Sequence, residues 1–438
     1  MTELATLAAR TDFITGDLSR PAGRPLSLLV LGGGSRGSTY AAAAVRRPDR
    51  AEVVGLAEPR PLIRDRLAAQ FGLRAENVFS DWREVLDRPR LADIALVTLQ
   101  DAMHVEAATA LADRGYQLLL EKPMATTWEG CLQIADAVRR NGTAVTVCHV
   151  MRYTPYTLAL KAQIAQGAIG DIVALEHLEP VGYYHYAHSF VRGNWANEQR
   201  STFMLLAKSC HDIDWILDVV GAPAARVTSM GALTHFRRDH APVGSADRCL
   251  DCAVEAACPF SAVRIYSDGL AEGGLKGVFL DIATGGEPTA AGLERALREG
   301  PYGRCVYRSD NNVVDHQIVG IEFANQVTAS FTMTAFTPVE NRRTRIFGTR
   351  GELTGDGRMI EVYDFLTEKT TVIDTQAFGL DLDGGHGGGD DALLTAYIDA
   401  CYEGRPDLIV TNLDSTLASH KVVFAAEQAR LTGTVVTV

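Results

Sequence analysis

The first third of the chain alternates apolar runs of strand length with amphipathic stretches of helical spacing. Such a rhythm is typical of parallel strands joined by helices that cover both faces of a sheet. The sequence therefore predicts a doubly wound Rossmann domain over residues 26–150, after a polar arm at 1–25. The expected strands lie at 26–31, 52–57, 94–99, 117–120 and 144–147.

Beyond residue 150 the hydrophobic pattern changes. One long helix is expected at 203–220, because apolar residues recur there with helical spacing and Gly221 follows. Later segments alternate with a period of two, which indicates strands with one buried face. We expect residues 151–438 to form a second, α+β domain with a large, mostly antiparallel sheet and C-terminal helices. The overall class is α/β. The expected later strands are 173–177, 318–323, 327–334, 343–348, 359–364 and 370–373.

A glycine-rich turn separates the first strand from the first helix. Gly32, Gly34 and Gly37 form G-x-G-x-x-G, and the acidic Glu58 ends the second strand. Glycines permit a tight turn and let backbone N–H groups approach a pyrophosphate at the helix N-terminus. Glu58 would accept hydrogen bonds from the ribose hydroxyls, which favours NAD. Arg36 and Arg60 can pair with a 2′-phosphate, so NADP stays open.

Composition excludes several classes of protein. The chain has 438 residues, 47% of them hydrophobic, and a net charge of −12. A negative net charge disfavours nucleic acid and anionic lipid as partners. We find no apolar run of membrane-spanning length and no signal-peptide pattern at the start. We therefore expect a cytoplasmic protein with a small-molecule substrate.

Further motifs resemble the glucose-fructose oxidoreductase and inositol dehydrogenase (Gfo/Idh/MocA) family over nearly the whole chain. The motifs are Val97-Thr98-Leu99-Gln100 with His104, Glu121-Lys122-Pro123, Arg152-Tyr153-Thr154-Pro155, Gly167-Ala168-Ile169-Gly170 and Gly348-Thr349-Arg350-Gly351. The resemblance implies that Lys122 contacts nicotinamide and the substrate hydroxyl. The expected cofactor-binding residues are Gly32, Gly34, Ser35, Arg36, Gly37, Glu58, Arg60, Thr98, Gln100, His104, Glu121 and Lys122.

The family pairs an aspartate with a histidine four residues later. Here the histidine matches His211, whereas Ala207 stands at the aspartate position. Helical spacing places Lys208 and Asp212 on the same face as His211. Oxidation of an alcohol needs a base poised near neutrality, and histidine has an ordinary pKa of about 6.5. We expect His211 to be the base and Lys122 to orient the substrate, with Lys208 as a further catalytic candidate.

An aromatic and imidazole run at 183–188 suits the faces and hydroxyls of a sugar, although such rings also pack in cores. A glycine-rich loop before the helix near 390 carries His386 and is too rich in glycine to be core. The candidate substrate-binding residues are Arg152, Tyr184, His188, Trp195, Asp212 and His386.

Three cysteines fall within ten positions, in an insert expected around 246–307. Cys249 and Cys252 form C-x2-C, Cys258 follows, and Cys305 offers a fourth thiol. Four thiolates suit a closed structural zinc site, so zinc is the first interpretation. An iron–sulfur cluster and metal-free thiols are the alternatives.

The patterns together favour an NAD(P)-dependent dehydrogenase that acts on a sugar or cyclitol. Two other hypotheses remain open at this point. One is a glycosidase that oxidises its substrate transiently and returns the hydride. The other is a non-catalytic, NAD-responsive sugar-binding protein, for which Ala207 is the support. We also expect a homo-oligomer formed through the sheet of the second domain.

Overall fold

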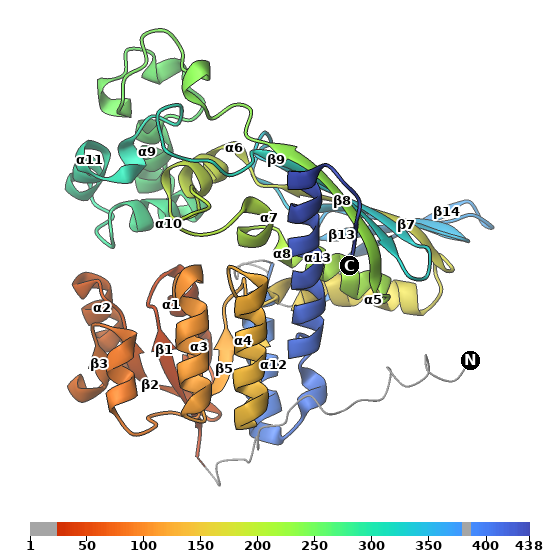
Figure 1. Cartoon of the computed structure of the whole chain (residues 1–438), viewed down its shortest axis with the longest axis horizontal. Coiled ribbons are helices and arrows are strands. Elements are labelled where there is room, and N and C mark those ends of the chain that lie inside the picture. The colour runs from red at the N-terminus through yellow and green to blue at the C-terminus, as the bar shows by residue number, and fades with distance from the viewer. Residues whose placement is uncertain (1–23, 379–386) are drawn as a thin grey trace. The chain divides into compact units, whose positions relative to one another are not determined.

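The computed structural model describes residues 24–378 and 387–438 of the chain. It divides into two compact units (Figure 1). Among the described residues, unit 1 comprises 24–154 with 387–418, and unit 2 comprises 155–378 with 419–438. The sequence places residues 387–418 in the second domain, whereas the structure groups these residues with unit 1. Within the described residues, no helix combines the length and the apolar character needed to cross a membrane.

Unit 1 is built on a six-stranded parallel sheet in the order β3-β2-β1-β4-β5-β6. This arrangement confirms the predicted Rossmann domain. The strands are β1 (Leu26–Leu31), β2 (Ala51–Ala57), β3 (Val78–Phe79), β4 (Ile94–Val97), β5 (Gln117–Leu120) and β6 (Val145–Val147). The helices are α1 (Ser35–Val45), α2 (Pro61–Phe71), α3 (His104–Asp113), α4 (Trp128–Asn141) and α12 (Gly389–Glu403).

The apolar run of β1 explains its central place in this sheet. All six of its residues are buried, as expected for a parallel strand covered on both faces. Leu28 and Val30 pack in a core with residues of α1, α2 and α12. Because side chains alternate along a strand, the side chains of Leu29 and Leu31 are buried on the opposite face of the sheet. The carboxyl end of β1 is therefore fixed where the glycine-rich turn begins.

Unit 2 contains a nine-stranded sheet in the order β14-β13-β12-β11-β7-β10-β9-β8-β15. Only the β7–β10 pair is parallel among its described pairings, which confirms a mostly antiparallel sheet. Its strands are β7 (Ile172–Pro180), β8 (Ala224–Ala232), β9 (His316–Phe323), β10 (Thr328–Thr334), β11 (Arg343–Gly348), β12 (Gly351–Gly355), β13 (Met359–Asp364), β14 (Lys369–Asp374) and β15 (Val436–Thr437).

One face of this sheet is buried and the other is open. In β10 the buried residues are Ala329, Phe331 and Met333, and their exposed or half-buried neighbours are hydroxylic. Helix α8 packs against β7 and β10, where the Trp215 ring stacks on His177 at 4.7 Å. The remaining helices outside the insert are α5 (Pro155–Ala165), α6 (Tyr183–Tyr186), α7 (Met204–Ala207), α8 (Cys210–Val220) and α13 (Leu413–Thr432).

The expected helix at 203–220 is two helices in the structure. Helix α7 ends at Ala207 and α8 starts at Cys210, with Lys208 and Ser209 between them. The backbone of Ser209 leaves helical geometry, with φ −104° and ψ 10°. Lys208 and His211 therefore do not share one continuous helix face.

The insert between β8 and β9 is helical, which the sequence did not predict. Its helices are α9 (Ala262–Glu272), α10 (Gly274–Ala283) and α11 (Ala290–Glu299). They enclose a small core of their own that includes Tyr266, Phe279 and Leu297. This apolar cluster packs the helices of the insert against one another.

Candidate functional site

The glycine-rich turn of unit 1 needs glycine at two positions. Gly32 has a φ of +94°, and a Cβ atom there would lie 2.4 Å from the Thr98 carbonyl oxygen. A Cβ atom on Gly37 would lie 1.9 Å from the Gly32 carbonyl oxygen. Both distances are far inside van der Waals contact, so these glycines build the turn itself.

Gly34 differs from the other two glycines. Its φ is −68°, which any residue adopts. The nearest atom to a Cβ built there is Arg60 Nη2, at 3.6 Å. The protein therefore leaves open space at Gly34. That space fits the close approach of a pyrophosphate to the backbone.

Helix α1 begins directly after Gly34. Within the described part of the chain, no side chain caps its first turn, and that turn holds no acidic residue. The first N–H groups of a helix lack intrahelical partners and carry partial positive charge. The turn and the start of α1 thus fit the pyrophosphate of a dinucleotide.

Glu58 follows β2 and lies almost fully buried beside this turn. Its Oε2 accepts a hydrogen bond from Gly33 N at 2.8 Å, and its Oε1 accepts one from Arg60 Nε at 2.6 Å. Arg60 N and Nη2 also donate to this carboxylate, at 2.9 and 3.0 Å. Although burial opposes ionisation, these bonds hold the pKa of Glu58 below its ordinary value. Arg60 thus covers the carboxylate that we expect at the ribose.

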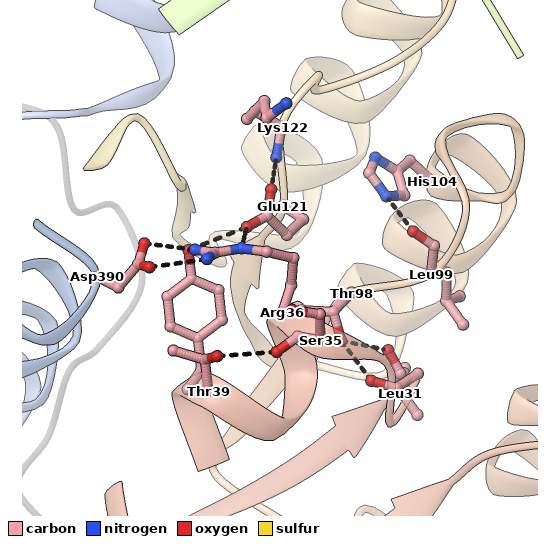
Figure 2. Close-up of polar contacts among 12 residues, drawn as sticks. Leu31, Ser35, Arg36, Thr39, Thr98, Leu99, His104, Glu121, Lys122 and Asp390 are labelled. Atoms are coloured by element: carbon pink, nitrogen blue, oxygen red, sulfur yellow. Dashed lines mark hydrogen bonds and ion pairs between the residues drawn. The ribbon is translucent and has the colours of Figure 1, made fainter. Parts of the chain in front are cut away.

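Arg36 reaches away from the turn to two buried carboxylates (Figure 2). Its Nε donates to Glu121 Oε1 at 2.8 Å, and its Nη1 donates to Asp390 Oδ2 at 2.7 Å. Tyr40 donates its hydroxyl to Glu121 Oε1 at 3.0 Å. Arg36 therefore does not stand free to pair with a 2′-phosphate, because its guanidinium is held by Glu121 and Asp390. This bridge could not be foreseen from the sequence pattern.

Glu121 also holds the backbone of the next residue, since Lys122 N donates to Glu121 Oε2 at 2.8 Å. Two other predicted cofactor residues brace the same edge of the sheet (Figure 2). Thr98 Oγ1 donates to Gly32 O at 2.7 Å. His104 contacts Pro123 O at 2.8 Å and Leu99 O at 3.1 Å through its two ring nitrogens. Ser35 is the first residue of α1, and Gln100 lies three residues after the end of β4. The predicted cofactor residues of unit 1 thus gather at the carboxyl end of its strands.

In unit 2, His211 lies in the first turn of α8 and is buried. Lys208 precedes that helix, and its Nζ lies 3.3 Å from Glu179 Oε1. Glu179 belongs to β7 and is also buried. The carboxylate beside Lys208 therefore comes from a strand 29 residues earlier in the sequence, and not from position 207.

Asp212 belongs to a buried ionic network in unit 2. Arg342 Nε donates to Asp212 Oδ1 at 2.5 Å, and Arg342 Nη2 lies 2.9 Å from Glu179 Oε2. His177 Nε2 also contacts Asp212 Oδ1 at 3.1 Å. Although burial opposes ionisation, the charge of Arg342 and the His177 bond hold the pKa of Asp212 well below its ordinary value. Asp212 is thus engaged in ion pairs within unit 2, and its contact with the substrate stays a prediction.

His188 lies in the π-helical segment Ala187–Arg192 and is 2% exposed. Its ring stacks between Phe279 and Tyr302, at 4.2 and 4.7 Å, and its Nδ1 contacts Tyr266 Oη at 2.8 Å. Burial lowers its pKa to about 3. His188 thus packs against the insert, and its predicted contact with the substrate is not tested by this packing.

The other candidate substrate residues have different surroundings. Tyr184 is half-buried and meets the Phe279 ring edge-on at 6.1 Å. Trp195 is also half-buried, 6.1 Å from the Phe190 ring. Arg152 is buried in unit 1, where its Nη1 donates to Val410 O at 3.1 Å. His386 lies outside the described residues.

The four cysteines of the insert do come together. Cys249, Cys252, Cys258 and Cys305 line one pocket of about 250 Å³. Yet across residues 24–378 and 387–438, no three His, Cys, Asp or Glu side chains are arranged to hold a metal ion. Burial raises the pKa of Cys258 and of Cys305, which favours the neutral thiols. Arg192 Nη2 lies 3.6 Å from Cys249 Sγ, so a protein cation already lies beside these sulfurs. The zinc prediction is not supported.

Two family models match nearly the whole chain. The model described as an oxidoreductase family with an NAD-binding Rossmann fold matches residues 26–149. The model described as the C-terminal alpha/beta domain of the oxidoreductase family matches residues 161–438.

The sequence identity to individual relatives is low or covers only part of the chain. The putative oxidoreductase YteT of Bacillus subtilis is 24% identical over 327 residues, which cover 69% of this chain and 71% of YteT. Inositol 2-dehydrogenase of Klebsiella pneumoniae is 33% identical over 146 residues, covering 33% of this chain and 43% of that enzyme. A solved structure of levoglucosan dehydrogenase with NADH and levoglucosan superposes with a TM-score of 0.69 at 18% identity, covering 95% of this chain and all of that one (100%).

Proposed function

Because the chain belongs to the Gfo/Idh/MocA oxidoreductase family, with both its NAD-binding and its C-terminal domain, we propose that it oxidises a hydroxyl carbon of a sugar or cyclitol. NAD would accept the hydride. Relatives named inositol 2-dehydrogenase and levoglucosan dehydrogenase support this substrate class. Neither alternative hypothesis, the redox glycosidase or the non-catalytic binding protein, gains support from these names. A homo-oligomer through the unit 2 sheet stays a prediction.

The observation that carries the proposal is the junction between β5 and the glycine-rich turn. Arg36 of the turn holds Glu121, and Glu121 holds the backbone N–H of Lys122. Dinucleotides bind outside the carboxyl ends of the strands in this fold. Lys122 lies at that edge, so its ammonium can donate a hydrogen bond to a substrate hydroxyl near the nicotinamide.

We assign the proton acceptor to His211. His211 lies in the first turn of α8, and imidazole is the side chain that most often accepts a proton in enzymes. Lys208 is less suited to this role, because its Nζ lies 3.3 Å from the Glu179 carboxylate and is engaged there. In this scheme the hydride leaves carbon for NAD, and His211 removes the hydroxyl proton. Lys122 orients the substrate.

A turnover screen tests the proposed function. Purified protein would be incubated with NAD and a panel of monosaccharides, anhydrosugars, inositols and aryl glycosides. We expect NADH to accumulate with at least one sugar or cyclitol. Release of an aglycone without net NADH would favour the glycosidase instead. Tight NADH binding with no turnover of any panel member would favour the binding protein.

We expect Glu58→Ser to shift the cofactor preference toward NADP. The substitution removes a carboxylate that repels a 2′-phosphate, and it frees the guanidinium of Arg60 to pair with that phosphate. A gained charge-assisted contact of about 1.5–3 kcal/mol corresponds to a change in the NADP/NAD affinity ratio of roughly 10- to 150-fold. Calorimetric titration with both cofactors measures this ratio.

The double variant Glu58→Ser/Arg60→Leu is the matched control for this prediction. It removes the same carboxylate and also the arginine that would bind the phosphate. We expect most of the gain in NADP affinity to disappear. An unchanged affinity ratio in Glu58→Ser would show that Glu58 does not lie at the ribose.

A further inference from the structure

We propose that Arg36 is a positioning residue for Lys122, acting through Glu121, and that Asp390 holds Arg36 in this role. The proposal rests on the proposed function of Lys122. It assigns to Arg36 a task other than cofactor binding, and it gives the start of α12 a part in catalysis.

A continuous series of hydrogen bonds connects Asp390 to Lys122 (Figure 2). Asp390 Oδ2 accepts from Arg36 Nη1 at 2.7 Å, and Arg36 Nε donates to Glu121 Oε1 at 2.8 Å. Glu121 Oε2 then accepts from Lys122 N at 2.8 Å. Every link in the series involves a charged group, and such bonds are stronger than neutral ones. The backbone of Lys122 is therefore held by a bridge that starts on α12.

The two carboxylates of the bridge are buried, so the charge state of each group in the bridge affects that of the others. The side chains of Glu121 and Asp390 are 7% and 1% exposed, and that of Arg36 is 29% exposed. Although burial opposes ionisation, the charges of Arg36 and Lys122 hold the pKa of Glu121 below its ordinary value. Removing Arg36 would leave two buried carboxylates without their shared cation. Glu121 would then protonate or move, and it would release Lys122 N.

Asp390 has a matched neighbour that does not join the bridge. Asp391 is the next residue of α12, and its carboxylate pairs with Arg46. That pair is exposed, with 57% of the Arg46 and 39% of the Asp391 side chain accessible. Exposed ion pairs contribute little to stability. Asp391→Asn therefore removes the same charge from the same helix turn without touching Lys122.

The experiment uses the full chain labelled with [15N]lysine. The sequence contains six lysines, so the spectrum holds six backbone amide signals, and Lys122→Arg identifies the one from Lys122. We expect this signal to shift in Asp390→Asn and in Arg36→Met, because its acceptor is Glu121 Oε2. It should shift less in Arg36→Lys, which keeps the charge. Asp391→Asn should leave all six signals in place.

Turnover provides the second readout. We expect kcat to fall about 10-fold or more in Asp390→Asn and Arg36→Met, since small misplacements of catalytic groups cost on this scale. NADH affinity should change less than kcat, and Asp391→Asn should match the wild type. An unshifted Lys122 amide, or an unchanged kcat in Asp390→Asn, would overturn the proposal. If the wild type turns over no sugar or cyclitol, the proposed function fails, while the Lys122 amide still decides whether the bridge positions that residue.

Discussion

Gly34→Val should abolish NAD binding and leave the melting temperature of the protein unchanged. The backbone of Gly34 has an ordinary φ of −68°, and a Cβ there meets no atom closer than 3.6 Å. The folded protein therefore accommodates the side chain. The pyrophosphate does not, because it must approach the backbone at this glycine. We expect the affinity for NAD to fall about 100-fold or more, which is about 2.8 kcal/mol of binding free energy. Calorimetric titration and a thermal melt measure the two effects.

Gly37→Ala is the contrasting variant from the same turn. Its Cβ would lie 1.9 Å from the Gly32 carbonyl oxygen, so the turn must distort and the melting temperature should fall. If a variant loses NAD binding and also melts at a lower temperature, the loss of binding is attributed to damage to the fold. Loss of binding at an unchanged melting temperature identifies the cofactor site. Wild-type NAD affinity in Gly34→Val would show that the dinucleotide does not lie at this turn.

The parts of the fold that follow from local pattern could be predicted from the sequence. The apolar run of β1 predicts a strand buried on both faces, and Gly32 and Gly37 predict the tight turn after it. The alternation in β10 predicts a strand with one open face. These features depend on the periodicity of side chains and on backbone sterics within a few residues.

The ionic contacts of the candidate site could not be predicted in this way. Arg36 and Asp390 are 354 residues apart in the sequence, and Asp212 and Arg342 are 130 apart. No local pattern specifies which arginine meets which carboxylate. The sequence indicates at most that the charged Asp212 falls within an apolar helix, since a buried charge needs a partner.

The insert is a region where local pattern is weak evidence. Its four cysteines indicate a metal site that the structure does not support, and the sequence does not predict the helices α9, α10 and α11. These helices are 10 or 11 residues long and lie close to glycines, so their apolar spacing is short and weak evidence. Cysteine spacing alone does not fix the directions of the thiols, and in the described structure a guanidinium lies next to Cys249.

Lys122→Ala and His211→Ala should each lower kcat by about 100-fold or more, the usual scale for a positioned acid–base group. Lys122 loses the ammonium that orients the substrate hydroxyl, and His211 loses the imidazole that accepts its proton. Lys122 is expected to contact the nicotinamide, but the pyrophosphate and ribose sites at the glycine-rich turn and the Glu58–Arg60 pair stay intact in both variants, so NAD affinity should stay close to that of the wild type. Steady-state kinetics and NADH fluorescence titration separate these effects.

Lys161→Ala is the matched control, because Lys161 has no part in the proposed scheme and its Nζ forms a partly exposed ion pair with Asp218 Oδ2 at 2.8 Å. It should keep the wild-type kcat. Lys208→Met distinguishes the two candidate bases, since it removes an amine while His211 remains. A low kcat in Lys208→Met together with a wild-type kcat in His211→Ala would transfer the role of base to Lys208. We expect the reverse result, because the Lys208 amine is engaged by Glu179 at 3.3 Å, whereas His211 accepts the proton in the proposed scheme.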